Sequence, residues 1–417
     1  MRTAGKVGLL TSLYLSQGLP FGLFTQALPA ILRRRGLSLT LVGLSSLLAL
    51  PWALKPLWAP LVDRHGRRRS WILPLQLAAA ALMATLTLFD PRHGLSAVLT
   101  GVLLSNLLAA SQDIATDGLA VDLLRPEERG LGNGVQVAGY RVGMIVGGGG
   151  LLLLYDQAGW WATTATGSAL LLAATLPILL YREPRRPPRA ADVSLAESIR
   201  RPGMWAWLAV LASYKAGDAL ATSMIRPLLV DLDLSLSDIG WLLGTVGFGA
   251  GLLGALLGGW AVGRLGRRRA LLCFGLLQAA GVASYLLPAT GSLRGLALVC
   301  GFEHMAGGMA TAALFTAMMD RSRPDTGATD YTVQASVVVV ATGAMAAVGG
   351  IIADRWGYTT HFTLSTLLCL AGAGAMWRGA RSDGVGQQGE PREQEADHPA
   401  LGQGEQRGTT RRRADPA

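Results

Sequence analysis

The sequence is short of charge, of cysteine and of lysine. Only 15% of its 417 residues are Asp, Glu, Lys or Arg, against roughly 25% in a soluble domain, whereas 51% are hydrophobic. This composition excludes a disordered chain and an ordinary soluble enzyme, and it indicates an integral membrane protein. Cys273, Cys300 and Cys369 all lie in apolar segments without metal-ligand spacing, so we expect neither a disulfide scaffold nor a metal site.

Motifs for covalent or nucleotide chemistry are also missing from the sequence. It contains no Ser-His-Asp grouping and no glycine-rich loop of the Walker type, so we expect neither an enzyme nor an ATP-driven pump, and no cofactor. The net charge of +10 could suggest a nucleic-acid partner, but nearly all the arginines stand in short gaps between apolar runs. That placement is typical of membrane topology, and we expect no binding of nucleic acid.

The sequence contains twelve apolar runs, and crossing a bilayer takes about 20 such residues. We predict an all-α membrane protein with an N-terminal six-helix bundle (1–181), a cytoplasmic linker (182–202), a C-terminal six-helix bundle (203–378) and a disordered cytoplasmic tail (379–417). The predicted spans are 7–32, 39–61, 71–89, 95–123, 131–154, 161–181, 203–230, 238–262, 270–288, 295–318, 328–353 and 361–378.

The basic residues predict the orientation of these spans. With the N-terminus in the cytoplasm, the cytoplasmic segments hold 27 Lys and Arg and the opposite side holds six. Cytoplasmic loops carry the excess of basic residues in membrane proteins. We therefore expect a multi-pass protein of the bacterial inner membrane with both termini in the cytoplasm.

The two halves of the sequence repeat one another. The segment Asp63–Arg69 recurs as Gly263–Arg269, and Val135-Gln136 recurs as Val333-Gln334. Because each half has an even number of spans, both halves enter the membrane from the same side and form parallel repeats. Two such bundles around a central cavity are typical of secondary transporters.

The repeated loop resembles the G-x-x-x-D-R-x-G-R-R signature of the major facilitator superfamily. The sequence departs from that signature at Ala59, which replaces the first Gly, and at Gly263, which replaces the acid in the second copy. We interpret the loop as a cytoplasmic gate between the halves. Its predicted gating residues are Asp63, Arg64, Gly66 and Arg67 in the first copy and Gly263, Arg264, Gly266 and Arg267 in the second.

Further blocks resemble the AmpG-like permeases within that superfamily. This group includes muropeptide permeases, acetyl-coenzyme A transporters and siderophore permeases that act alone. The length of the chain and its opening blocks resemble the siderophore branch more than the longer muropeptide permeases. The blocks are Leu15–Pro20, Lys55–Pro60, Ser111–Ile114, Gly139–Gly143, Tyr214–Asp218 and Phe302-Glu303.

Three charged residues near the middle of the first bundle suggest a site for proton coupling. Asp113 and Asp117 are one helical turn apart on one face, and Arg141 lies at a similar depth on the next span. A structural ion pair is one interpretation. We favour the other, in which two neighbouring carboxylates cannot both ionise easily, so that one carries a proton and Arg141 is the counter-charge.

The remaining intramembrane polar residues are candidates for substrate binding. Lys215 and Asp218 share a helical face, and either a salt bridge between them or an anionic substrate group on Lys215 fits that spacing. Glu303 is favoured over its neighbour His304 as the side chain that points into the cavity. The complete set of candidates is Lys215, Asp218, Glu303, Tyr14, Gln17, Tyr140, Tyr214 and Lys55.

Together these features predict a proton-coupled symporter that imports a bulky anionic organic solute. A siderophore is favoured, and a muropeptide or an acetyl-coenzyme A-type solute is the alternative. A receptor or scaffold that kept the fold and lost transport is the alternative of another class. We expect a monomer whose partners are membrane lipid, a small-molecule substrate and the coupling proton.

Overall fold

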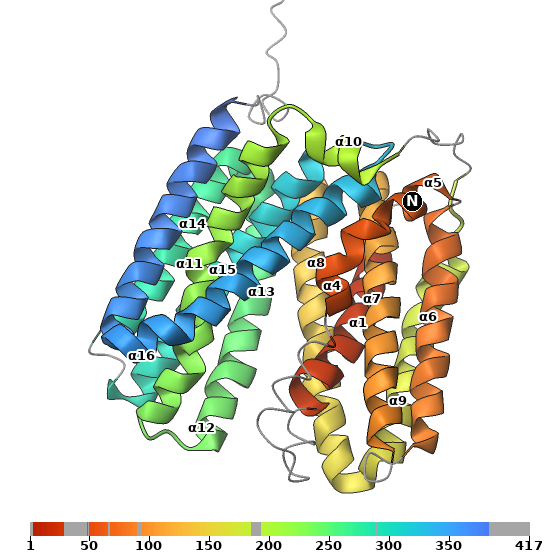
Figure 1. The fold of residues 1–417 in the computed structure, drawn as a ribbon, viewed down its shortest axis with the longest axis horizontal. Coiled ribbons are helices and arrows are strands. Elements are labelled where there is room, and N and C mark those ends of the chain that lie inside the picture. The colour runs from red at the N-terminus through yellow and green to blue at the C-terminus, as the bar shows by residue number, and fades with distance from the viewer. Residues whose placement is uncertain are drawn as a thin grey trace, which may run out of the picture.

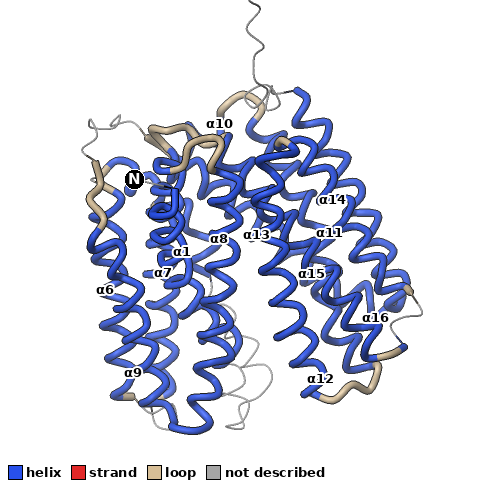
Figure 2. The backbone as a smooth tube through the Cα atoms, turned by 180° about the vertical axis from the view of Figure 1, so that it is seen from behind, coloured by secondary structure: helices blue, strands red, loops and turns tan. Residues whose placement is uncertain are grey.

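The computed structural model describes residues 3–28, 48, 50–65, 67–89, 94–184, 193–287 and 291–382. Within those ranges every regular element is a helix (Figure 2). The helices form two bundles side by side, one from each half of the chain (Figure 1). The predicted all-α fold with two bundles is therefore confirmed. Gly66 lies outside the described residues, and so does the predicted tail 379–417 except for residues 379–382, which continue the last helix.

The described part of the first bundle contains five long helices and a set of short ones. Its elements are α1 (Thr3–Gly22), η1 (Leu23–Ala27), α4 (Leu50–Leu54), η3 (Lys55–Leu57), α5 (Ala59–Arg64), α6 (Arg68–Thr85), η4 (Leu86–Leu88), α7 (Leu95–Leu123), α8 (Arg129–Met144), η5 (Ile145–Gly150) and α9 (Leu151–Leu180).

The second bundle repeats this arrangement after a short connecting helix. Its elements are α10 (Leu195–Arg200), α11 (Met204–Asp231), α12 (Leu236–Gly240), η6 (Trp241–Gly247), α13 (Phe248–Leu265), α14 (Arg267–Ala283), η7 (Ser284–Leu286), α15 (Leu293–Asp320) and α16 (Gly327–Ser382).

The membrane crossings follow from the lengths of these helices. In the described residues, eight helical stretches are long and apolar enough to cross a membrane. Two of them are 52 residues long, and each is broken by a glycine in a non-helical conformation, Gly159 with φ 76° and Gly357 with φ 76°. Glycine tolerates this conformation because it lacks a Cβ. Each of the two stretches therefore crosses twice. α11 covers nearly all of the predicted span 203–230, and the predicted span 39–61 is described only at residue 48 and from Leu50 onward.

Glycines let the helices of the first bundle approach closely. A Cβ added to Gly143 or Gly147 would collide with the backbone of α1 at Leu15 and Leu19. Small residues at such positions allow backbone packing in a membrane, where no hydrophobic effect drives helices together. Gly147 therefore belongs to a surface on which α1 packs, whereas Gly149 and Gly150 face open space.

The two bundles are held together at the end that carries the N-terminus. In Figure 1 the described helices converge at this end and diverge toward the other. Asp63 of α5 accepts hydrogen bonds from the backbone N–H of Thr329 (2.7 Å) and Ala328 (3.3 Å), at the start of α16. A carboxylate at a helix N-terminus satisfies unpaired N–H groups and the helix dipole. Asp63 also forms a fully buried ion pair with Arg68.

A second seam lies between α8 and α15 at the same end. Asp320 forms ion pairs with Arg129 of the first bundle at 2.9 Å and with Arg267 of the second bundle at 2.9 Å. Arg267 also donates to the backbone carbonyl of Pro126. The repeated loop therefore contributes to both seams, through an acid in the first copy and an arginine in the second.

The start of α1 is fixed to the turn between α7 and α8. Lys6 Nζ donates to Glu128 Oε2 at 2.5 Å and to the carbonyl of Leu123 at 2.9 Å. The hydrogen bond from Lys6 lowers the pKa of Glu128 from 4.5 to about 2. The stability from this contact is complete above the ordinary pKa of the carboxyl, and it is lost as the pH falls toward the lowered value.

We predict that replacing Asp63 with Ala opens the closed end. The amides of Ala328 and Thr329 would lose their acceptor and Arg68 would lose a buried partner. Leaving such groups unpaired costs on the order of 1–3 kcal/mol, which corresponds to a rise of about 5- to 150-fold in hydrogen exchange of those amides. Exchange mass spectrometry of peptides that span 326–332 measures it.

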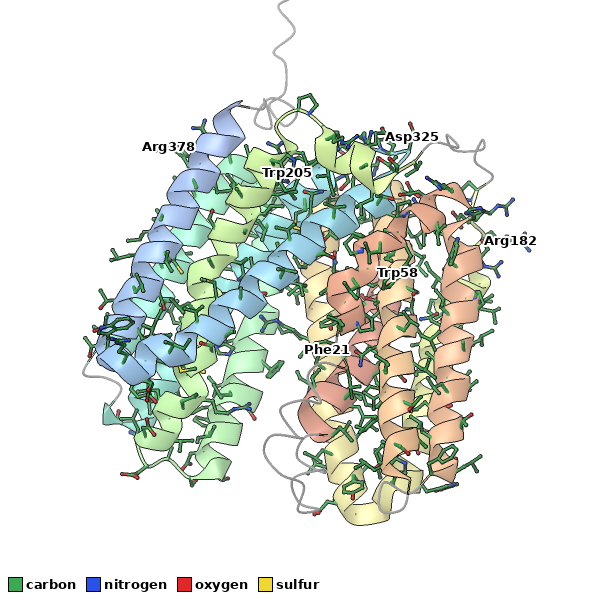
Figure 3. All side chains as sticks on the ribbon, in the orientation of Figure 1. Phe21, Trp58, Arg182, Trp205, Asp325 and Arg378 are labelled. Atoms are coloured by element: carbon green, nitrogen blue, oxygen red, sulfur yellow. The ribbon has the colours of Figure 1, made fainter. Side chains whose placement is uncertain are left out.

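Asp325→Ala is the matched control, because Asp325 is exposed on the loop just before α16 (Figure 3). Its exchange should equal that of the unmodified protein. Unchanged exchange at Ala328 and Thr329 in the Asp63 variant would show that this carboxylate does not hold the halves together.

Candidate functional site

A cavity of about 610 Å³ lies between the two bundles, and both bundles contribute to its lining. Its aromatic side chains in the first bundle are Tyr14, Phe21, Trp52 and Tyr140. Phe21 contacts both Trp52 and Tyr140, with ring centroids 5.6 Å apart in each case. The charged side chains are Lys55, Asp113, Asp117 and Arg141 from the first bundle and Lys215, Asp218, Glu303 and His304 from the second.

Lys55 and Asp113 form a buried ion pair in the wall of the cavity. Their residues are only 3% and 7% exposed, so neither charge is solvated by bulk water. Lys55 lies where α4 tightens into the 3-10 turn η3 before Pro56, and its ammonium is 5.7 Å from the centre of the Trp52 ring. A cation over an aromatic face gains electrostatic energy, which adds to the ion pair.

Asp117 has different partners, although it lies one turn from Asp113 on α7. Its carboxylate accepts the hydroxyl of Tyr14 at 2.9 Å and the amide of Gln136 at 3.2 Å. Both donors are neutral, and Asp117 is buried. The two acids thus share a helical face, as the sequence predicts, but Lys55 pairs directly with Asp113 alone among the described residues.

We expected Arg141 to be the counter-charge of Asp113 and Asp117, but the structure does not pair it with either acid. It extends from α8 across the interface, and its guanidinium lies against Gly251 of α13 in the other bundle. The carboxylates that act on it electrostatically are Glu303 and Asp218 of that bundle. Arg141 does line the same cavity as the two acids, but depth along a helix does not specify which way a long side chain points.

On the side of the second bundle, two pairs of oppositely charged or basic and acidic side chains line the described part of the cavity. Lys215 Nζ lies 2.6 Å from Asp218 and also donates to Gln278 at 3.0 Å and Thr311 at 3.3 Å. The spacing of three residues therefore does produce a salt bridge. Glu303 lies 2.5 Å from His304.

Glu303 and His304 both line the cavity, where we expected only Glu303. The buried Glu303 carboxylate turns toward the neighbouring imidazole, so the two side chains meet at the cavity wall. Adjacent residues on a helix point in different directions, so both line a cavity only when the cavity extends over both of their faces.

Two candidate residues lie outside the cavity lining. Tyr214 is 1% exposed and its hydroxyl donates to the carbonyl of Leu271 at 2.8 Å inside the second bundle. Gln17 is fully buried in the first bundle, and neither atom of its amide has a hydrogen-bond partner among the described residues. Tyr14 and Tyr140 do line the cavity, so the helical face decides which polar residues of a span reach it.

The sequence did contain a signal for one wall that we did not predict. Glu303, Gly307, Thr311 and Phe315 follow one another at intervals of four on α15, and all of them line the cavity. That spacing defines one face of a helix. His304, Trp52, Phe21, Gln136 and Tyr331 were also missed, because each resembles an ordinary buried side chain in the sequence.

The predicted gating residues are divided among several roles. Arg64 donates to the carbonyl of Val193 at 2.7 Å, Arg264 lies over the ring of Trp260 at 4.3 Å, and Arg267 pairs with Asp320. Arg67 is exposed at the start of α6, Gly266 adopts φ 77° before α14, and Gly263 faces open space.

The basic partner of Asp63 is Arg68, which we did not predict. Arg68 is completely buried and also lies 3.3 Å from Asp122.

The described residues contain no group of His, Cys, Asp and Glu that could hold a metal ion.

The chain is similar to proteins of one superfamily along nearly its whole length. The family model described as Major Facilitator Superfamily matches residues 10–228 and again residues 206–407. The Escherichia coli K12 anhydromuropeptide permease is 31% identical over 380 residues, which cover 87% of this chain and 77% of that protein. An uncharacterized Haemophilus influenzae protein is 31% identical over 383 residues, covering 86% of this chain and 90% of that one.

Solved structures share the fold at low sequence identity. The human organic anion transporter MFSD10 superposes with a TM-score of 0.75 at 16% identity, covering 90% of this chain and 100% of that one. The Escherichia coli fucose:proton symporter superposes with a TM-score of 0.70 at 16% identity, covering 90% of this chain and 98% of that one.

We predict that the Lys55–Asp113 pair is essential as a pair. Lys55→Gln or Asp113→Asn alone should destabilise the protein by about 3–5 kcal/mol, because each leaves a buried charge without its partner. The double variant should recover most of that loss, since no unpaired charge remains. Thermal unfolding of the detergent-solubilised protein measures all three variants. Exposed Asp325→Asn is the control, and additive losses in the double variant would exclude direct coupling.

Proposed function

The chain belongs to the major facilitator superfamily and to its AmpG-like permeases, and from that premise we propose a proton-coupled importer of anhydromuropeptides. The observation that carries this proposal is the cavity between the halves, which combines aromatic rings with charged groups from both bundles. A sugar-peptide offers carboxylates for the cations and a bulky organic body for the rings. The named Escherichia coli permease supports this substrate over the siderophore that chain length favoured.

The closed end supports the proposed side of access to the cavity in this conformation. The end that carries the N-terminus also carries Arg182 and Arg378 (Figure 3). The excess of basic residues in the loops supports a cytoplasmic position for this end. With that orientation the cavity is sealed toward the cytoplasm by the Asp63 and Asp320 seams, and solute enters from the periplasmic side of the inner membrane.

Asp117 is the proton-carrying residue in this proposal. Asp113 and Asp117 lie in one buried cluster, and among the residues that the structure describes a single cation, Lys55, is directly paired there. Two neighbouring carboxylates with a single positive charge retain surplus negative charge unless one of them binds a proton. Asp113 is already neutralised by Lys55, whereas Tyr14 and Gln136 can hydrogen-bond Asp117 in either protonation state after small reorientations.

We predict that the purified protein in proteoliposomes accumulates labelled anhydromuropeptide when a proton gradient is imposed. Uptake should fall to the level of empty liposomes when an ionophore collapses the gradient. Ferric siderophore and acetyl-coenzyme A are the competing substrates in parallel assays. Uptake of siderophore alone would exclude the muropeptide assignment, and failure of counterflow with all three would favour a receptor or scaffold.

We also predict that Asp117→Asn separates coupling from translocation. An amide cannot release a proton, so the variant should lose at least about 90% of gradient-driven accumulation while exchange of internal for external solute continues. Asp117→Glu is the matched control, since it retains the titratable group on the same turn of α7. Normal accumulation by the Asn variant would show that the coupling proton binds elsewhere.

A further inference from the structure

Gly251 provides the surface on which an arginine of the opposite bundle rests. A Cβ added at Gly251 would collide with Nη1 of Arg141 and would lie 2.7 Å from its Cζ. Arg141 belongs to α8 of the first bundle and Gly251 to α13 of the second, so the guanidinium crosses the interface inside the cavity. Any side chain at position 251 would displace this guanidinium.

The guanidinium of Arg141 retains hydrogen-bonding capacity that the other cavity cations have used. Among the described residues, Lys55 is paired with Asp113, Lys215 with Asp218 and His304 with Glu303. Arg141 makes no ion pair or side-chain hydrogen bond with any residue that the structure describes, although it lines the cavity.

The two carboxylates that act electrostatically on Arg141 already have other partners. Glu303 and Asp218 act on its charge, but each has a basic neighbour of its own, His304 at 2.5 Å and Lys215 at 2.6 Å. A guanidinium presents five N–H donors in a planar fork that matches a carboxylate. The fork of Arg141 is therefore available to a solute, and it lies where both bundles meet.

We propose that Arg141 binds a carboxylate of the transported solute and that Gly251 positions its guanidinium across the interface. This inference rests on the proposed function in that an organic anion enters the cavity. Because the guanidinium lies against Gly251, a carboxylate bound to Arg141 is also close to the second bundle. Binding of the anion therefore involves both halves at once, and it discriminates against solutes whose carboxyl groups are blocked.

The test compares an anhydromuropeptide with the same compound after amidation of its carboxyl groups, with binding to the detergent-solubilised full chain measured by calorimetry. Arg141→Gln should weaken binding of the free acid by about 10- to 100-fold, the range of a charge-assisted hydrogen-bonded pair, and Arg141→Lys should weaken it less. The amidated compound should bind the unmodified protein and the Gln variant equally.

Gly251→Ala should weaken binding of the free acid by about 10-fold, because the added methyl displaces the guanidinium of Arg141 from its position. The loss is moderate because only the end of a flexible side chain has to move. Gly249→Ala is the matched control on the same helix, since a Cβ there meets nothing within 4 Å. Thermal unfolding of both alanine variants verifies that each is folded.

Two results would overturn the inference. One is unchanged affinity of Arg141→Gln for the free acid. The other is an equal loss for the free and amidated compounds, which would make Arg141 a latch between the halves with no contact to the carboxylate. A carboxylate siderophore is the second probe. If it bound with the same dependence on Arg141 while the muropeptide did not bind, the proposed substrate would fail and this inference would stand.

Discussion

The low dielectric of the membrane interior is the constraint on which the rest of this structure depends. A charge at mid-bilayer costs at least about 2.5–3.5 kcal/mol unless it is paired or hydrated. The described charges of the cavity wall meet this constraint in pairs, Lys55 with Asp113, Lys215 with Asp218 and Glu303 with His304. Asp117 and Arg141 depart from direct pairing, and for that reason they are the residues to which we assign the proton and the solute anion.

The two copies of the repeated loop hold the closed end together through different interactions. In the first copy of the repeated loop an acid, Asp63, meets the unpaired N–H groups at the start of α16. In the second copy Gly263 replaces that acid, and Arg267 instead shares Asp320 with Arg129 of the opposite bundle. The repeat therefore conserves the position of the seams but not their interactions, because a helix N-terminus favours an anion whereas a carboxylate favours a cation.

The glycines connect packing to function. Gly143 and Gly147 allow α8 and η5 to lie directly on α1, and this fixes the helix that carries Arg141 and Tyr140. Gly251 serves a different purpose, because the atoms opposite it belong to a side chain of the other bundle. In a bilayer, where lipid tails are as apolar as leucine, such steric fit replaces the hydrophobic effect as the force that selects one arrangement of helices.

Most of the fold and part of the site could be predicted from the sequence. Apolar runs of membrane length, the excess of basic residues in one set of loops and the repeated segment Asp63–Arg69 determine two helical bundles, because the bilayer permits little else for a spanning chain. Helical spacing also placed Asp113 with Asp117 and Lys215 with Asp218.

Only the tertiary structure decided which charge meets which. Lys55 rather than Arg141 neutralises Asp113, Arg68 rather than Arg64 pairs with Asp63, and Tyr214 faces the bundle interior. Lysine and arginine side chains are long enough to reach several neighbours at one depth, so their partners depend on how the helices rotate and cross, which the spacing within one helix does not specify.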